Sequence, residues 1–497
     1  MKTIIRLSNI LLCGLLLSCS SDFLNMKPAN STAAEDAITN LKEARTAMNG
    51  VYRQFTSSNY YGNLFTMYSE YRGADMVVPM NGRGDGALFQ FSHNPDANTY
   101  FSTYWAHMYW TLAQINNVIA NIESGKVVVE PSEEIDINDI KGQALALRAM
   151  VHFDLVRLYG YPYMKDQGAS WGAVIVTELV PASAKLQRST VAQTYTQVEA
   201  DLNAATPLLK KTKTNGRINY WGAKALLARV SLYKGDFAGA YTHASEVINS
   251  GLYSLYETEA QWSDSWRSSF GTESIFEFVV RASENDPGTG SIRRYLMPGY
   301  NNGLGALYAS DPFLALLGQD PDDFRWTMMD LDELGIVATD VADPDYNRRG
   351  WCVKYEMPTG SASMTAHGLP VIRLSEIYLI GAEAALKKSG PDLANAASWL
   401  NAIRKRAPNL PLAQASDSDL ENKILDERSK ELLCEGHRFF DLMRLGKTIT
   451  YQQTLAVIPP GGRGSTVTWD FHKIVLPIDI AEKRVNPDIY QNAGYEW

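Results

Sequence analysis

Residues 371–407 read VIRLSEIYLIGAEAALKKSGPDLANAASWLNAIRKRA, and their apolar pattern predicts two helices. Apolar and small residues recur at helical spacing in each half: Leu374, Ile377, Gly381, Ala384 and Ala385, then Leu393, Ala396, Ala397, Leu400 and Ile403. Between the halves, Ser389-Gly390-Pro391 ends one helix and starts the next, because glycine accepts a left-handed C-terminal cap and proline suits a first turn. Two helices with so short a link pack antiparallel, so residues 371–406 are predicted to form a helical hairpin.

Further along, residues 426–447 read DERSKELLCEGHRFFDLMRLGK and are dense in charge. Glu427, Glu431 and Glu435 follow one another at i, i+4 spacing, which places them on one face of a helix. One interpretation is a catalytic carboxylate cluster. The other is a structural ion network, since buried charges persist only when they are paired. We favour the network, with these expected partners: Arg428, Arg438 and Arg444 neutralising Glu431, Glu435 and Asp441.

Several long motifs in this order resemble the SusD/RagB family of Bacteroidetes outer-membrane lipoproteins. The motifs are ALRAMVHFDLVRLYGYPY at 146–163, RLSEIYLIGAEA at 373–384, LNAIRKRA at 400–407, the stretch 426–447, LPI at 476–478 and NPDIYQNAGY at 486–495. The resemblance implies an all-α, SusD-like fold, in which tetratricopeptide-type helix pairs form a scaffold with long irregular loops and a few minor strands. It also implies a glycan-binding lipoprotein that partners a SusC-like TonB-dependent transporter in the outer membrane.

The amino terminus carries a secretion signal. Residues 1–18 combine Lys2 and Arg6 with an apolar run that is too short for a permanent transmembrane helix. Leu16-Leu17-Ser18-Cys19 resembles a bacterial lipobox, so Cys19 is the expected lipidation site, the alternative being an ordinary cleaved signal with an incidental cysteine. We therefore expect residues 19–497 to form a single domain that is lipid-anchored to the outer membrane and faces the cell exterior.

Composition and motif content argue for a binding protein. The chain has 497 residues, is 45% hydrophobic and has a net charge of -9, so it can bury a large core and is a poor partner for nucleic acid. The histidines are dispersed and the HExxH motif does not occur, so no catalytic residue, metal site or cofactor is predicted; calcium is left open. Cys352 and Cys434 remain in the mature chain, and their spacing does not say whether they bridge.

Helix pairs are expected at about 101–159, 191–251 and 371–406. Residues 221–251 resemble a tetratricopeptide repeat with a tight turn at Gly235-Asp236. An amphipathic helix is also predicted at 41–55. Two long loops, about 60–104 and 262–370, separate these helices, with short apolar runs at 274–280 and 350–355 as candidate minor strands. Ordered loops on a rigid helical scaffold are where binding residues usually lie.

Both loops contain aromatic, amide and charged residues suited to sugars. The candidates are Asn81, Arg83 and Asp85 in the first loop, and Tyr295, Tyr300, Asn301, Asn302 and Tyr308 in the second. Flat rings stack on apolar sugar faces, while amides and charged groups bond hydroxyls directly or through water. The family resemblance places glycan sites in the same regions. Ordinary loop packing is the alternative for each residue.

The leading hypothesis is capture of oligo- or polysaccharide for a SusC-like transporter. The alternatives are a RagB-like peptide-import component of the same family and, from a different class, a hydrolytic lipoprotein. If residues 371–446 are scaffold, Glu431→Ala should lower stability and leave binding intact, whereas Tyr300→Ala should do the reverse.

Overall fold

The computed structural model describes residues 38–79, 86–96, 102–181, 183–298, 303–331, 350–355, 363–452 and 457–497. The predicted signal peptide and Cys19 lie outside the described residues. Within them the chain is predominantly helical and the strands are short. The predicted all-α fold class, with a few minor strands, is confirmed.

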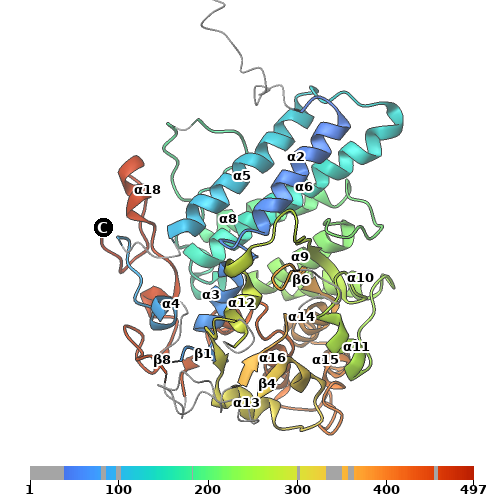
Figure 1. Cartoon of the computed structure of the whole chain (residues 1–497), viewed down its shortest axis with the longest axis vertical. Helices are drawn as coiled ribbons and strands as arrows, with labels where there is room; N and C mark the ends of the chain where they lie inside the picture. Colours follow the sequence, from blue (N-terminus) through green and yellow to red (C-terminus); the bar gives the residue numbers. More distant parts are fainter. Residues whose placement is uncertain are drawn as a thin grey trace, which may run out of the picture.

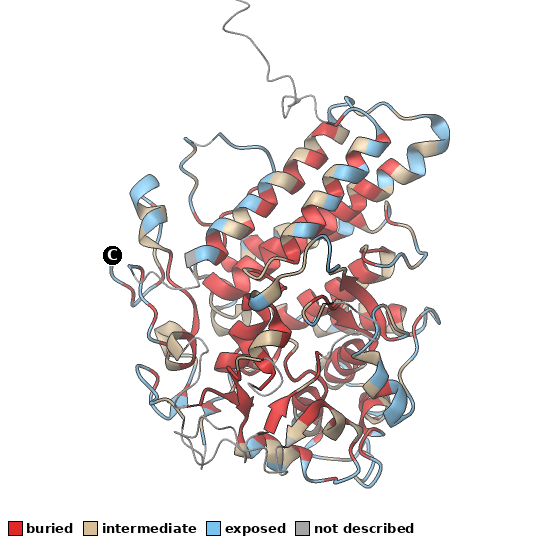
Figure 2. Ribbon diagram, viewed as in Figure 1, coloured by how far each residue is buried: buried red, intermediate tan, exposed pale blue. Residues whose placement is uncertain are grey.

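Four long helices form one end of the molecule (Figure 1): α2 (Leu41–Phe55), α5 (Ser102–Glu123), α6 (Glu134–Tyr159) and α8 (Val191–Ala205). α6 packs against the other three. It is therefore buried along most of its length, as Figure 2 shows. α2 is more one-sided, with its apolar face buried and its polar face open to solvent.

The first helical hairpin consists of α9 (Tyr220–Lys234) and α10 (Phe237–Ile248). Gly235 ends α9 in the left-handed region with a φ of 83°, and the side chain of Asp236 caps α10 by accepting a hydrogen bond from the Gly239 N–H at 2.9 Å. The tight turn predicted at Gly235-Asp236 is therefore confirmed.

The second hairpin, α14 (Leu374–Lys387) and α15 (Leu393–Arg404), coincides with the pair predicted at 371–406. A Cβ atom on Gly381 would lie 2.7 Å from the ring of Trp399, so only glycine lets the two helices approach this closely. α10 packs against α14, so the two hairpins stack and bury faces that neither covers alone.

Shorter elements connect these helices. The other α-helices are α3 (Leu64–Arg72), α4 (Gly86–Gln90), α7 (Tyr163–Asp166), α11 (Glu259–Ser265), α12 (Ile292–Leu296), α13 (Asp311–Leu317), α16 (Leu420–Glu431), α17 (Arg438–Arg444) and α18 (Ile480–Val485). The 3-10 turns are η3 (Pro131–Glu133), η4 (Gly288–Gly290), η6 (Phe324–Met328) and η8 (His472–Ile474).

The strands form antiparallel pairs that join segments distant in sequence. They are β1 (Met76–Val77) with β3 (Tyr308–Ala309), β2 (Ser274–Phe278) with β6 (Leu369–Arg373), β4 (Met329–Leu331) with β5 (Gly350–Cys352), and β7 (Ile449–Thr450) with β8 (Thr466–Val467). β2 and β5 confirm the minor strands expected near 274–280 and 350–355. β1 and β3 belong to the two loops predicted to bind ligand, so the structure brings those loops together.

Buried residues concentrate where the helices meet (Figure 2). Cys352 and Cys434 lie in this interior as free thiols, which answers the question that their spacing left open. Among the described residues, the structure has no helix with the length and apolar character needed to cross a membrane.

Candidate ligand-binding site

Most of the predicted ligand-binding residues lie outside the described part of the chain. Asn81, Arg83, Asp85, Tyr300, Asn301 and Asn302 lie outside the described residues. Tyr295 lies on α12, half-buried against the core. The expectation for these residues stays a prediction.

Tyr308 departs from the expectation. It lies on β3 opposite Val77, and its exposed fraction is 0%. Its ring meets the ring of Trp351 edge to face, with centroids 6.1 Å apart. Because core side chains cover the ring, Tyr308 packs the interior and is not accessible as a sugar-stacking platform. The β1–β3 pairing, which its loop position does not reveal, turns it inward.

The described residues do contain one hollow of ligand size that the second predicted loop helps to form. It is lined by Asn49, Gly50, Tyr52, Arg53 and Thr56 of α2 and its end, by Asn215, Gly216 and Arg217, and by Phe278, Val279, Arg281, Ser283, Glu284 and Asn285. Its volume is about 740 Å³, within the range of small-molecule sites. We call this hollow the α2 groove.

Two contacts hold the walls of the α2 groove in place. Gly216 has a φ of 74°, and a Cβ there would lie 2.3 Å from a methyl carbon of Val279, so the two walls meet at a position that favours glycine. Across the groove, the Asn285 amide donates hydrogen bonds to the Thr56 hydroxyl at 3.1 Å and to the Val279 carbonyl at 2.8 Å. The 279–285 segment is thereby fastened to the end of α2.

Tyr52 forms part of the floor of the groove. Its hydroxyl donates to the Gln143 side chain at 2.8 Å and accepts from the Ile218 N–H at 3.1 Å, so the ring is fixed. Burial raises the pKa of the Tyr52 hydroxyl above its ordinary value, which keeps it neutral. The Arg217 guanidinium lies over this ring, 4.3 Å from its centroid, and donates to the Asn49 side chain. Arg217 is therefore a cation held in a set position.

The groove offers polar groups with different bonding capacities. Asparagine amides both donate and accept, arginines donate only, and the Glu284 carboxylate accepts only. Such a set can bond several hydroxyl groups of one ligand. Tyr52 and Phe278 are almost fully buried, so they contribute a firm floor and no broad exposed ring.

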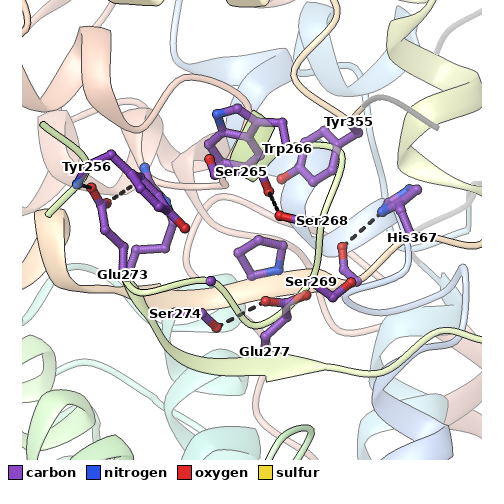
Figure 3. Close-up of a pocket in the computed structure, with 14 residues that line it drawn as sticks. Tyr256, Ser265, Trp266, Ser268, Ser269, Glu273, Ser274, Glu277, Tyr355 and His367 are labelled. Atoms are coloured by element: carbon purple, nitrogen blue, oxygen red, sulfur yellow. Dashed lines mark hydrogen bonds and ion pairs between the residues drawn. The ribbon is translucent and has the colours of Figure 1, made fainter. Parts of the chain in front are cut away.

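A second pocket, shown in Figure 3, is lined by carboxylate, serine and histidine side chains but is too small to hold a sugar. It lies between the 265–271 segment and strands β2 and β6, and its volume is about 30 Å³, room for a few water molecules. The Glu277 carboxylate accepts from the Phe270 N–H at 2.9 Å and the Ser274 hydroxyl at 3.0 Å. Burial lowers the pKa of His367 to about 4, and its Nδ1 donates to the Gly368 carbonyl at 3.0 Å. The hydrogen bonds of these groups within the protein hold the 265–271 segment against the two strands.

Glu427 and Glu431 of α16 belong to a buried ion cluster, as the structural interpretation predicted. Glu431 is fully buried, with its Oε1 atom 3.0 Å from Arg373 and 3.2 Å from Arg406. Its other oxygen lies 3.6 Å from Arg325, which also contacts Glu427 at 2.6 Å. Charges this deep and this well paired hold elements together and leave no route for a substrate.

The predicted partners within the cluster were only partly right. Arg428 and Arg444 do pair with Asp441, at 2.9 Å each. Glu431 and Glu435 instead pair with cations outside the 426–447 stretch. Glu435 lies 2.6 Å from Arg373 of β6 and 2.5 Å from Lys354. Arg438 reaches across to Asp75 at 3.1 Å. The reason is long-range packing, which brings Arg373 of β6 and Lys354, just after β5, to the end of α16.

Sequence reasoning missed the α2 groove, although one signal was available. Arg45, Asn49 and Arg53 recur at i, i+4 spacing and so line one face of α2 opposite its apolar side. Polar residues on a surface helix are the ordinary case, so this stripe carries no information until the facing segments are known.

Comparison with known proteins agrees with this fold. The family described as "SusD family" matches residues 338–495, and the one described as "Starch-binding associating with outer membrane" matches residues 22–232. A SusD superfamily protein from Bacteroides thetaiotaomicron is 32% identical, with a TM-score of 0.84 over 91% of this chain and 99% of that one. Another from Bacteroides vulgatus is 33% identical, with a TM-score of 0.83 over 93% of this chain and 100% of that one.

A third relative is the starch-binding protein SusD of Bacteroides thetaiotaomicron, which is 30% identical over 28% of this chain and 24% of its own length. The fold of stacked helical hairpins with short strand pairs is thus shared with solved SusD superfamily structures along nearly the whole chain. The chain belongs to the SusD/RagB family.

Proposed function

We propose that the protein is a cell-surface glycan-binding lipoprotein, which captures oligo- or polysaccharide and delivers it to a SusC-like TonB-dependent transporter in the outer membrane. Three findings support this proposal: membership of the SusD/RagB family, the matched family's description as starch-binding and associating with the outer membrane, and the relative named as starch-binding. Lipidation at Cys19 would keep the protein at the membrane.

The observation that carries the proposal is the α2 groove. Its volume of about 740 Å³ admits an oligosaccharide segment, and its amide and guanidinium groups match ring hydroxyls. The protein would act by binding alone, because the carboxylates of the ion cluster and of the Figure 3 pocket are bonded within the protein.

Isothermal titration of the secreted chain carrying Cys19→Ser, which prevents lipidation, tests capture. We expect a subset of polysaccharides to bind, and Asn49→Ala to weaken that binding. Arg484→Ala is the matched control, because the Arg484 side chain is exposed on α18, does not line the groove, and makes no hydrogen bond or ion pair among the described residues. Binding of peptides with no binding of any glycan would indicate the RagB-like alternative.

Two further measurements test the rest of the proposal. Chromatography of polysaccharide after prolonged incubation should show no shortened products, and their appearance would establish a hydrolase. Capture of a TonB-dependent barrel from detergent-solubilised outer membranes by the lipidated protein would support delivery, while its absence from such captures would count against it.

A further inference from the structure

We infer that the α2 groove selects acidic glycans, those whose sugars carry carboxylate or sulfate groups. This inference rests on the proposed function and concerns the ligand class of the same groove.

The groove is longer than its largest hollow. A neighbouring hollow of about 300 Å³ lies along the first half of α2, lined in part by Arg45, Asp136, Asp139 and Lys210. The two hollows share Asn49 and Arg217. They therefore form one track beside α2, a shape suited to a chain of sugars rather than to a single small molecule.

Positive charge accumulates along this track. Its lining contains five cations, Arg45, Arg53, Lys210, Arg217 and Arg281, against three carboxylates, Asp136, Asp139 and Glu284. The excess of two positive charges is opposite in sign to the chain as a whole, whose net charge is -9. A positively charged groove on a negatively charged protein attracts anionic ligands to the groove.

Two of these cations have no carboxylate partner among the described residues. Arg53 is exposed, and its guanidinium makes no hydrogen bond or ion pair within that part of the chain. The Arg217 guanidinium donates to the Asn49 carbonyl oxygen and lies over the Tyr52 ring, and it has no ion pair with any described carboxylate. The other cations differ, since Arg45 and Lys210 share Asp136, and Arg281 lies 3.1 Å from Glu284.

Arg53 and Arg217, the two cations without a described carboxylate partner, lie within reach of one ligand. Asn49 and Arg53 are separated by one helical turn, and Arg217 donates to Asn49 from the facing loop. A guanidinium presents a planar fork of donors that matches the oxygens of carboxylate and sulfate, whereas a neutral hydroxyl uses only one donor. An acidic sugar therefore gains charge-assisted hydrogen bonds that a neutral sugar of the same shape cannot make.

Matched ligand pairs test the inference. Oligogalacturonate and its methyl ester have the same sugar backbone and differ in the carboxylate charge, so titration with both measures the contribution of that charge to affinity. Dextran sulfate and dextran give the same comparison for sulfate. We expect at least one acidic probe to bind about tenfold or more tightly than its neutral counterpart, the scale of one charge-assisted hydrogen bond. The probe that binds identifies the acid group. Raising the salt from about 0.1 M to about 1 M should weaken this binding, because it screens exposed charges.

Variants tie the selectivity to the groove. Arg53→Glu should weaken binding of the acidic probe by about tenfold or more, and Arg217→Gln should also weaken it. Arg484→Glu changes the net charge of the protein by the same amount as Arg53→Glu, away from the groove, and should leave affinity within about twofold. The Arg53 side chain has no partner within the described part of the chain, so its variant should fold with an unchanged melting temperature.

Three results would overturn the inference: equal affinity for charged and neutral partners, no binding of either acidic probe, or the same loss in Arg53→Glu and Arg484→Glu. If a neutral glycan binds and Asn49→Ala weakens it, the proposed function stands and only the selectivity fails. Binding of peptides alone overturns both.

Discussion

Arginine is concentrated in two regions of this molecule, and the regions differ in what surrounds it. In the ion cluster at α16, Arg325 has an exposed fraction of 0% and lies 2.6 Å from both Asp323 and Glu427. In the α2 groove, Arg53 faces solvent without a described partner. Burial makes pairing obligatory, since an isolated buried charge is too costly, whereas exposure lets a cation stay unpaired and ready for a ligand. The same residue type therefore serves structure in one place and recognition in the other.

The largest expected effect is that of Glu431→Ala, which removes the carboxylate at the centre of the cluster. Arg373 and Arg406 would keep Glu273, and Arg373 would also keep Glu435, but both arginines would lose Glu431. We expect the free energy of unfolding to fall by about 3–5 kcal/mol, as when one member of a buried ion pair is deleted. Urea denaturation measures this change.

Glu421→Ala is the matched control on the same helix. The Glu421 side chain is 42% exposed and pairs with Lys387 at 3.0 Å on the surface, so its loss should cost no more than about 1 kcal/mol. Ligand affinity per folded molecule should be unchanged in both variants. A selective loss of binding in Glu431→Ala would break the division between structural and recognition arginines.

The next effect concerns acid. Burial by itself would raise the pKa of Glu383, but the Arg444 guanidinium at 2.6 Å outweighs it and lowers the pKa from 4.5 to about 2. For Glu435, burial is likewise outweighed by Arg373 and Lys354, and its pKa is also about 2. Both folded-state values lie below the unfolded ones, so this stabilisation is complete above pH 4.5 and is lost as the pH falls toward 2.

Each carboxyl should contribute on the order of 3 kcal/mol, which urea unfolding from neutral pH down to about pH 2 would reveal. Glu383→Gln cannot titrate, so its stability should depend less steeply on pH across this range. An equally steep dependence in the variant would show that other groups control acid unfolding.

A smaller effect is expected for Gly216→Ala in the wall of the α2 groove. The substitution forces an alanine to adopt a positive φ and brings its Cβ against Val279, so stability should fall by about 2 kcal/mol and ligand affinity should fall with it. Gly251→Ala isolates the backbone cost, because Gly251 has a φ of 68° and nothing within 4 Å of the added carbon. If both variants bind ligand equally well, the contact with Val279 does not shape the site.

The helical hairpins were predictable because their signals are local. Gly235 and Asp236 occupy adjacent positions, and each fulfils its usual role at the end or the start of a helix. The close contact at Gly381 also follows from the run of small residues in its own helix. The partners of Glu431 were not predictable, since Arg373 lies 58 residues away on a strand whose docking depends on the whole fold.

The α2 groove was hidden for a related reason. Asn49, Arg217 and Asn285 come from three distant segments, and none belongs to a recognisable motif. Tyr308 shows the converse, because its loop composition suggested exposure while pairing with β1 buries it. Local patterns predict elements, but which polar residues end up facing each other is a property of their assembly.

The sharpest test of the comparison replaces one arginine by alanine in each region. The variant in the α2 groove should show the smallest effect on stability. Arg53→Ala should change the free energy of unfolding by no more than about 0.5 kcal/mol, because its guanidinium is solvated and bonds nothing described. Arg325→Ala leaves Asp323 and Glu427 buried without their shared cation and should cost about 3–5 kcal/mol. Urea denaturation gives both values. A loss above about 1 kcal/mol at Arg53 would make it a structural residue, and its unpaired state would then no longer mark a site kept free for a ligand.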